Sequence, residues 1–503
     1  MERGGGSGVQ ATMDESGTDA AQNPTETQTQ TQTETETQTE TQTQTETQTP
    51  AQALAALLHP ARSIEGLDVP VTLVQDIVLR QALFDGRTST VELCEKLHVG
   101  PSVMTMIIEE LRELRYLEVQ GLESRNYKLA LTEVGREQTN DRLQMCRYAG
   151  AVPVSLAVYC AVVRAQHATP SIDMASLRAA FSDLVVADEL LEELGPATLA
   201  GGAMFLYGPP GTGKSSIAER LLRVHTDSVA IPYAVEVDGQ VITVFDPIQH
   251  KPVAVQPDSL DRRWVLCERP SIIVGGELTG RMLDLAYEPG SGVYLAPLQM
   301  QANNGILVID DFGRQTLTPE QLLNRWIVPL DRQVDYLSLN YGVKFAVPFD
   351  PKIVFSTNLE PEVLGDEAFF RRIQSKILIP TIDDDQFDEV LRRVCIAQSI
   401  PIAPGAPTYL RHISRTFGDG DLRPYLPAAM VKILQSMSAF RKCAPVLDRA
   451  TIDRAARVYF THARKLNGVG AAAAPAHRPA LAPVPVLDGG PQLTARGWLV
   501  ADR

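Results

Sequence analysis

Eight consecutive residues near the middle of the chain have the types and spacing that bind a nucleotide's phosphates. The stretch Gly208–Ser215 fits Gly-x-x-x-x-Gly-Lys-Ser, follows the apolar run Ala203–Leu206 and precedes a helical pattern at Ile217–Val224. Glycines let the backbone aim successive N–H groups at phosphates, and the positive end of the following helix adds attraction. The sequence therefore predicts a phosphate-binding loop made of Gly208, Pro209, Pro210, Gly211, Thr212, Gly213, Lys214, Ser215 and Ser216.

Two carboxylates follow a second strand-like run. The apolar stretch Gly305–Ile309 ends in Asp310 and Asp311. At a phosphate site a lysine neutralises charge, a serine hydroxyl and a carboxylate hold Mg²⁺, and a second carboxylate polarises the attacking water. We therefore predict that Lys214 contacts phosphate, that Ser215 and Asp310 are the metal ligands, and that Asp311 acts on water.

An amide and two arginines complete the candidate constellation. The apolar run Lys352–Thr357 ends at Asn358, whose amide would position water or contact the terminal phosphate. Further on, Arg371 and Arg372 stand together at the end of a short helical pattern. A planar guanidinium stabilises the spread charge of a phosphoryl group in transfer. For the arginines, a surface salt-bridging pair remains the alternative.

These segments together resemble the AAA+ ATPase family. GPPGTGKS corresponds to Walker A, ILVIDD to Walker B, FSTN to sensor 1 and DEAFFRR to the arginine-finger motif, in the family's order. The resemblance implies that Asn358 is sensor 1 and that Arg371 and Arg372 act on the neighbouring subunit's nucleotide. It also implies that Arg423, just before a helical pattern, contacts the γ-phosphate in its own subunit.

The resemblance covers roughly Leu190–Leu466. It implies an α/β fold: a P-loop NTPase (AAA+) parallel-sheet core with a C-terminal α-helical lid, ATP and Mg²⁺ as cofactors, and a homo-oligomeric ring. The lid helices are expected at Gln386–Ala397, Thr408–Phe417, Leu426–Phe440 and Ile452–Lys465.

Two hairpins and one substitution distinguish this chain. Strand patterns at 331–339 and 343–347 resemble the pre-sensor-1 hairpin of MoxR-like AAA+ proteins, and Val235–Val244 predicts a hairpin with an Asp-Gly turn. Asp311 stands where most relatives have Glu. The shorter reach keeps open a nucleotide-gated scaffold with negligible turnover.

The N-terminal half of the chain contains a second small domain. Helical patterns at Leu73–Phe84, Thr88–Leu97 and Ser102–Leu114, followed by two extended segments, predict a winged helix-turn-helix, with Thr88 and Ser102 as helix caps. Because the third helix carries Glu109, Glu110 and Glu113, a protein-docking or purely structural module is favoured over DNA binding. A helical connector at Leu177–Leu194 is expected to stop at Gly195-Pro196.

Composition limits the remaining choices. The net charge is −15, about half of it in the first 50 residues, and the six cysteines lack metal-site spacing. An acidic chain gives no general support for nucleic-acid or anionic-membrane binding, and scattered cysteines fit a reducing compartment. The predicted divisions are a disordered Thr/Gln/Glu-rich tail at 1–52, a winged-helix-like domain at 53–150, a helical connector at 151–185, the AAA+ core at 186–384, the lid at 385–466 and a flexible tail at 467–503.

These observations converge on one functional expectation. The sequence predicts a cytoplasmic ATP hydrolase without membrane insertion that remodels a protein client in the manner of a chaperone. A DNA-binding regulator with an ATP-driven assembly switch is the alternative.

Overall fold

The computed structural model describes residues 50–123, 126–167, 172–361, 371–418 and 420–460. The chain separates into two units, Met1–Gln52 and Ala53–Arg503. Both predicted tails and the helical pattern before Arg371 lie largely outside the described residues. Within the described ranges, no helix has the combined length and apolar character that crossing a bilayer requires.

A five-stranded parallel sheet organises the second unit. Its order is β10 (Ser271–Val274), β13 (Ile306–Ile309), β16 (Lys352–Thr357), β5 (Ala203–Tyr207) and β17 (Ser375–Leu378), and all neighbouring pairs are parallel. The three central strands are almost wholly buried, as expected for a parallel sheet covered on both faces. The predicted α/β P-loop core is confirmed.

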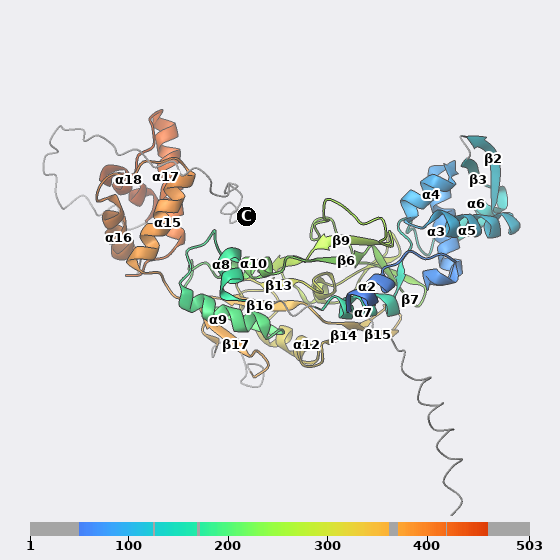
Figure 1. Ribbon diagram of the computed structural model, residues 1–503, viewed down its shortest axis with the longest axis horizontal. Helices are drawn as coiled ribbons and strands as arrows, with labels where there is room; N and C mark the ends of the chain where they lie inside the picture. Colours follow the sequence, from blue (N-terminus) through green and yellow to red (C-terminus); the bar gives the residue numbers. More distant parts are fainter. Residues whose placement is uncertain (1–49, 124–125, 168–171, 362–370, 419, 461–503) are drawn as a thin grey trace, which may run out of the picture. The chain divides into compact units, whose positions relative to one another are not determined.

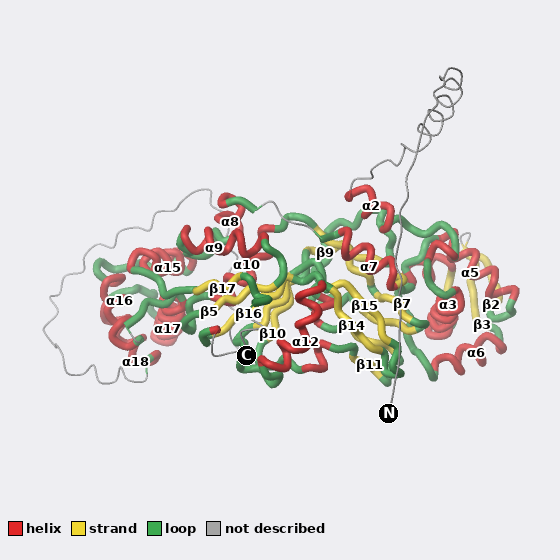
Figure 2. Tube along the Cα trace, turned by 90° about the horizontal axis from the view of Figure 1, so that it is seen from below, coloured by secondary structure: helices red, strands yellow, loops and turns green. Residues whose placement is uncertain are grey.

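Helices cover both faces of this sheet (Figure 2). Met204 and Leu206 pack with one set of helices, whereas Phe205 packs with Trp326 on the opposite face. This alternation follows from the two-residue period of a strand. The covering elements are α8 (Met174–Ala180), α9 (Asp188–Leu199), α10 (Lys214–Leu221) and η2 (Leu222–Val224) on the first face, and η3 (Gly280–Leu283), α11 (Leu298–Gln301) and α12 (Pro319–Arg332) on the second.

The helical connector differs from its prediction. The expected continuous helix is divided into α8 and α9, and Gly195 and Pro196 lie inside α9 instead of ending it. A Cβ at Gly195 would approach Leu177 to 2.9 Å, so the glycine permits close packing of the two helices. Burial of Leu194 and Ala197 on either side of the pair outweighs the hydrogen bond that proline forfeits.

Two smaller sheets take most of their strands from residues 228–295, between α10 and β13 in the sequence (Figure 1). The predicted Asp-Gly hairpin is confirmed, with Asp238 and Gly239 both in the left-handed region, at φ 52° and 76°. One sheet pairs β6 (Ser228–Pro232) with β9 (Trp264–Glu268); the other has the order β11 (Ala286–Glu288), β12 (Val293–Leu295), β8 (Gln240–Thr243), β7 (Ala234–Val237) and β4 (Val154–Ser155), which leads into α7 (Leu156–Ala165).

The second predicted hairpin also forms. Strands β14 (Val334–Ser338) and β15 (Lys344–Pro348) pair antiparallel directly before β16. The first strand starts later than expected, because Asp331 and Arg332 still belong to α12.

The N-terminal part of the second unit contains helices and a three-stranded antiparallel sheet of order β1-β3-β2. Two predicted caps are wrong: Ser89 caps the second helix in place of Thr88, and the third helix begins after Gly100, with Ser102 already inside it. Ser89 is the N-cap because Glu92 lies three residues later and completes a capping box. The elements are α2 (Pro50–Leu57), η1 (Glu65–Leu67), α3 (Val71–Asp85), β1 (Thr88–Ser89), α4 (Thr90–Leu97), α5 (Pro101–Glu113), β2 (Leu117–Glu123), β3 (Asn126–Leu131) and α6 (Glu133–Leu143).

The C-terminal part is helical, as predicted. Its own apolar core includes Phe387, Leu410, Leu434 and Ile452. The four helices are α15 (Asp384–Ala397), α16 (Ala406–Phe417), α17 (Tyr425–Arg441) and α18 (Arg449–Tyr459), and the predicted extension of the last one to Lys465 lies outside the described residues.

Candidate functional site

Three glycines shape the loop between β5 and α10. Gly208, Gly211 and Gly213 have φ values of 139°, 77° and 93°, a backbone that residues with a Cβ rarely adopt. A Cβ at Gly208 would also collide with the Ile379 carbonyl oxygen, and one at Gly211 with the Tyr425 ring. Gly213 precedes α10 without a side-chain cap, which leaves the first N–H groups of that helix to an anionic ligand.

Lys214 is almost completely buried at the start of α10, with 6% of its surface exposed. Its Nζ donates to the main-chain oxygens of Gly208 (3.0 Å) and Pro209 (2.8 Å), so the lysine folds back over the loop. Burial lowers the pKa of Lys214 to about 8, while the carboxylates of Asp310 and Asp311 oppose that shift. An anionic ligand beside this ammonium would raise its pKa again.

Ser215 and Asp310 contact each other. The Ser215 hydroxyl donates to Asp310 Oδ2 at 2.7 Å, which joins the start of α10 to the end of β13. The Asp310 N–H in turn donates to the Val274 carbonyl of the neighbouring strand at 2.8 Å. A hydroxyl and a carboxylate oxygen are thus presented side by side, as Mg²⁺ bound to phosphates requires.

Asn358 connects the lysine to the second carboxylate. Its Oδ1 accepts from Lys214 Nζ at 2.7 Å, and its Nδ2 donates to Asp311 Oδ1 at 3.1 Å. Asp311 has a left-handed backbone, with φ 49°, and its side chain is exposed. The carboxyl ends of three adjacent strands therefore bring together the lysine, the serine, the two carboxylates and the amide predicted for phosphate, metal and water.

The residues present fit Mg²⁺ and a nucleoside triphosphate. The glycine loop offers backbone N–H donors and a lysine, and Ser215 with Asp310 supplies the hard oxygen ligands that Mg²⁺ prefers. Mg²⁺ needs only one or two protein ligands when phosphates and water complete its shell. The described residues contain no cluster of three or more His, Cys, Asp or Glu that could hold a metal ion.

The three arginines are placed differently from one another. Arg423 lies close enough to Lys214 to contribute to the lowering of its pKa. Arg371 is exposed, whereas Arg372 donates from Nε to both carboxylate oxygens of Asp331, at 3.0 and 2.9 Å. The alternative of a surface ion pair is therefore found for Arg372, in its contact with Asp331.

Sequence reasoning missed two residues that brace this site. Thr357 Oγ1 donates to the Phe312 carbonyl at 2.8 Å, and Gln315 Nε2 donates to the Asp310 carbonyl at 2.7 Å. Both contacts depend on how loops fold back on the strand ends. The only sequence signal was the position of Gln315 a few residues after the acid pair.

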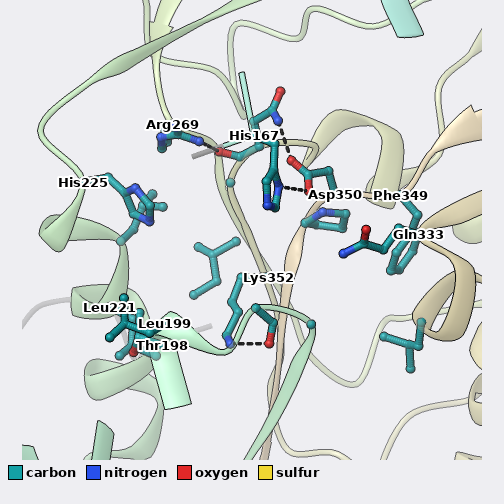
Figure 3. A pocket seen from close by; sticks show the side chains of 18 of the residues that line it. His167, Thr198, Leu199, Leu221, His225, Arg269, Gln333, Phe349, Asp350 and Lys352 are labelled. Atoms are coloured by element: carbon teal, nitrogen blue, oxygen red, sulfur yellow. Dashed lines mark hydrogen bonds and ion pairs between the residues drawn. The ribbon is translucent and has the colours of Figure 1, made fainter. Parts of the chain in front are cut away.

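A separate pocket of about 120 Å³ lies at the opposite ends of the strands, where Ile306 and Lys352 begin β13 and β16 and Gly202 directly precedes β5. Figure 3 shows Lys352 among its lining residues. Lys352 Nζ donates to the carbonyls of Ala197 (2.7 Å) and Gly201 (2.8 Å), at the end of α9. A cation suits the negative end of a helix, so we interpret this lysine as structural.

Comparisons with known proteins add little about activity. A family model described as a domain of unknown function (DUF8689) matches residues 383–458, the region of α15 to α18. No curated protein matches the chain.

Among solved structures, RuvB of Thermotoga maritima, titled a Holliday junction branch migration motor, is 14% identical; the match covers 58% of this chain and 72% of that one, with a TM-score of 0.33. The FIGL-1 AAA domain is 13% identical over 57% of this chain and 80% of that one, with a TM-score of 0.29. Similarity of this degree carries no conclusion about activity, substrate or assembly. The fold class follows from the parallel sheet and the glycine loop between β5 and α10.

Proposed function

We propose that the chain is an AAA+ ATPase that binds and hydrolyses ATP with Mg²⁺. The observation that supports this most is the continuous contact from Lys214 through Asn358 to Asp311, beside the Ser215–Asp310 pair. Three segments that are distant in the sequence converge at the carboxyl ends of adjacent strands. A structural role alone would not require a buried lysine, an amide and two carboxylates to meet behind a glycine loop.

Each residue has a distinct role in this proposal. The loop from Gly208 to Ser216 holds the triphosphate, with Lys214 neutralising charge on its terminal groups. Ser215 and Asp310 would hold Mg²⁺, which when bound neutralises charge on the phosphate oxygens. Asp311 accepts the proton of the attacking water, and Asn358 orients that carboxylate.

The arginines connect the site to oligomerisation. Arg423 acts within the same chain, near Lys214. Arg371 is the better candidate to reach a neighbouring copy, because its side chain is exposed whereas that of Arg372 is half-buried. A guanidinium supplied by another subunit would make a homo-oligomeric ring necessary for turnover.

The N-terminal region serves, in our proposal, as a winged-helix-like module that recruits a protein client. The exposed face of α5 carries Glu109 and Glu113 beside Arg112, a poor match for DNA phosphates. Met106 and Tyr127 are 41% and 53% exposed and suit a surface that docks a protein. For these reasons client remodelling is preferred to DNA reading.

The client is expected to meet the β14–β15 hairpin as well, in line with the MoxR-like branch. Tyr336 and Tyr341 of this hairpin region are 56% and 52% exposed. The six free cysteines fit a reducing cytoplasm.

Complementation between two inactive variants tests the proposal. Asp310→Ala removes the metal ligand but keeps the arginines, whereas Arg371→Ala with Arg372→Ala keeps an intact loop and acid pair. Each variant alone should lack turnover, and a mixture should regain part of it if one subunit's arginines complete another's site. Mixed oligomers that form, as judged by size-exclusion chromatography, and yet stay inactive would contradict the shared site.

A further inference from the structure

The turn that follows β13 is fastened by one side chain. Gln315 uses both ends of its amide: Nε2 donates to the Asp310 carbonyl at 2.7 Å, and Oε1 accepts from the Gly313 N–H at 2.8 Å. Arg314 N–H closes the same turn on the Asp311 carbonyl at 3.0 Å. The amide of Gln315 therefore bridges the two sides of the turn that contains Asp311.

The backbone inside this turn is unusual. Asp311 adopts φ 49° and Gly313 φ 101°. Asp is one of the few residues with a Cβ that enter the left-handed region readily. The opposite side of the turn is held by Thr357, whose hydroxyl donates to the Phe312 carbonyl, and by the Phe312 N–H, which donates to the Ser356 carbonyl at 2.7 Å.

The left-handed conformation has a consequence for the acid pair. A carboxylate on Asp is one methylene shorter than on Glu, so its position depends more strongly on the direction in which the Cα–Cβ bond leaves the backbone. With the turn as observed, Asp311 Oδ1 comes within 3.1 Å of Asn358 Nδ2, on the amide that also contacts Lys214.

We propose that Gln315 is a positioning residue for the acid pair: by fastening the left-handed turn it directs the short Asp311 carboxylate to the water-activating place beside Asn358. The inference rests on the proposed ATP hydrolysis and deepens it. Gln315 does not touch the reacting atoms and acts through Asp311. Both halves of its amide are needed, since one end donates and the other accepts.

Three variants test this role. Gln315→Met keeps the length but removes both hydrogen bonds, and Gln315→Glu keeps the acceptor for Gly313 but loses the donor to Asp310. Gln321→Met is the matched control, because Gln321 also makes a local hydrogen bond, from the Thr318 N–H, but at the start of α12. We expect kcat to fall by ~10–100-fold in both Gln315 variants, with KM for ATP within about twofold, and to stay unchanged in the control.

A double variant distinguishes loss of positioning from general damage to the fold. In an Asp311→Asn chain, Gln315→Met should cost nothing further, since the group that it positions is already inactive. An equal additional loss of kcat in that background would overturn the proposal, as would unchanged kcat in the single Gln315 variants.

Asp311→Glu should not raise turnover, because the left-handed turn suits Asp. A large rise in kcat would contradict the proposal that the turn places the short carboxylate correctly.

A binding measurement decides the matter without turnover. The probe is Mg²⁺ with ADP and aluminium fluoride, which imitates the phosphoryl group in transfer. Gln315→Met should weaken binding of this complex by about tenfold and leave ADP alone unaffected; equal weakening of both, or of neither, would overturn the inference. A wild-type chain that binds the complex but does not turn over ATP above the Lys214→Ala blank would count against the proposed function and not against this one.

Discussion

Lys214 and Lys352 lie at opposite ends of the strands of the same parallel sheet, and their pKa shifts and hydrogen bonds are alike. Burial lowers the pKa of each to about 8, and each donates to two main-chain carbonyl oxygens. Their surroundings differ. Lys214 also donates to the Asn358 side chain, and the carboxylates of Asp310 and Asp311 act on its pKa. The pKa of Lys352 is lowered by burial.

The difference shows that a perturbed lysine does not mark a functional site by itself. Lys352 neutralises the carbonyl end of α9 and needs no ligand to do so. Lys214 is surrounded by the groups that we propose bind and hydrolyse ATP. The position at the carboxyl ends of the strands, together with convergent polar side chains, is what separates the two.

The largest expected effect is loss of turnover in Lys214→Ala. Removal of the charge that faces the phosphates should lower ATP hydrolysis by at least ~100-fold, while circular dichroism and the melting temperature remain close to wild type. Steady-state phosphate release measures it. Retained turnover in a correctly folded variant would remove the functional distinction between the two lysines.

Asp310→Ala should lower turnover almost as much, by removing a metal ligand. Without this carboxylate, Mg²⁺ should no longer strengthen ATP binding, so titrations with Mg²⁺ and with EDTA should give the same affinity. Hydrolysis should be lost as well. If Mg²⁺ still strengthened ATP binding in the variant, Asp310 would not be the metal ligand.

Lys352→Met is expected to affect stability and not activity. Two carbonyl groups at the end of α9 lose their donor, which should lower the free energy of unfolding by ~1–3 kcal/mol. ATP turnover below the melting transition should stay within about twofold of wild type. A selective loss of turnover in this variant would show that the pocket in Figure 3 takes part in the reaction.

The smallest expected effect is the uptake of a proton when the triphosphate binds. The folded-state pKa of Lys214 is about 8, so at pH 8.5 the amine is mostly neutral, and triphosphate binding should raise its pKa and draw in a proton. Calorimetry in buffers of different ionisation enthalpy should show proton uptake in wild type and none in Lys214→Arg. Equal uptake in both chains would assign the proton to another group.

The same pKa directions fix the effect of pH on folding. Below about pH 8 both lysines are protonated in folded and unfolded chains, and the folded chain bears the cost of buried charge. Between about pH 8 and the ordinary value of 10.5, the unfolded chain holds more protons, so these lysines make stability rise with pH. Lys352→Met should remove its share of that rise in chemical denaturation.

Features encoded by neighbouring residues were predictable from the sequence. The glycine loop, the acid pair and Asn358 each follow an apolar run, and parallel strands bring their ends to one edge. The Asp-Gly hairpin was predictable for a similar reason, because its turn residues are adjacent. The four C-terminal helices were predicted to within a few residues where they are described.

Features set by long-range packing were not predictable. Pro196 remains inside α9 because neighbouring side chains are buried, and no local pattern reveals that. Gln315 looks like an ordinary polar loop residue until the turn brings its amide to the Asp310 carbonyl. The roles of Arg371 and Arg372 depend on a second copy of the chain and stay predictions.

The most direct test of the central claim is steady-state ATP hydrolysis at increasing protein concentration, with Lys214→Ala as the blank. Wild type should exceed the blank, and its activity per subunit should rise with concentration as shared sites assemble. Activity equal to the blank at every concentration, in a chain that remains folded, would contradict the assignment of this site as an ATPase.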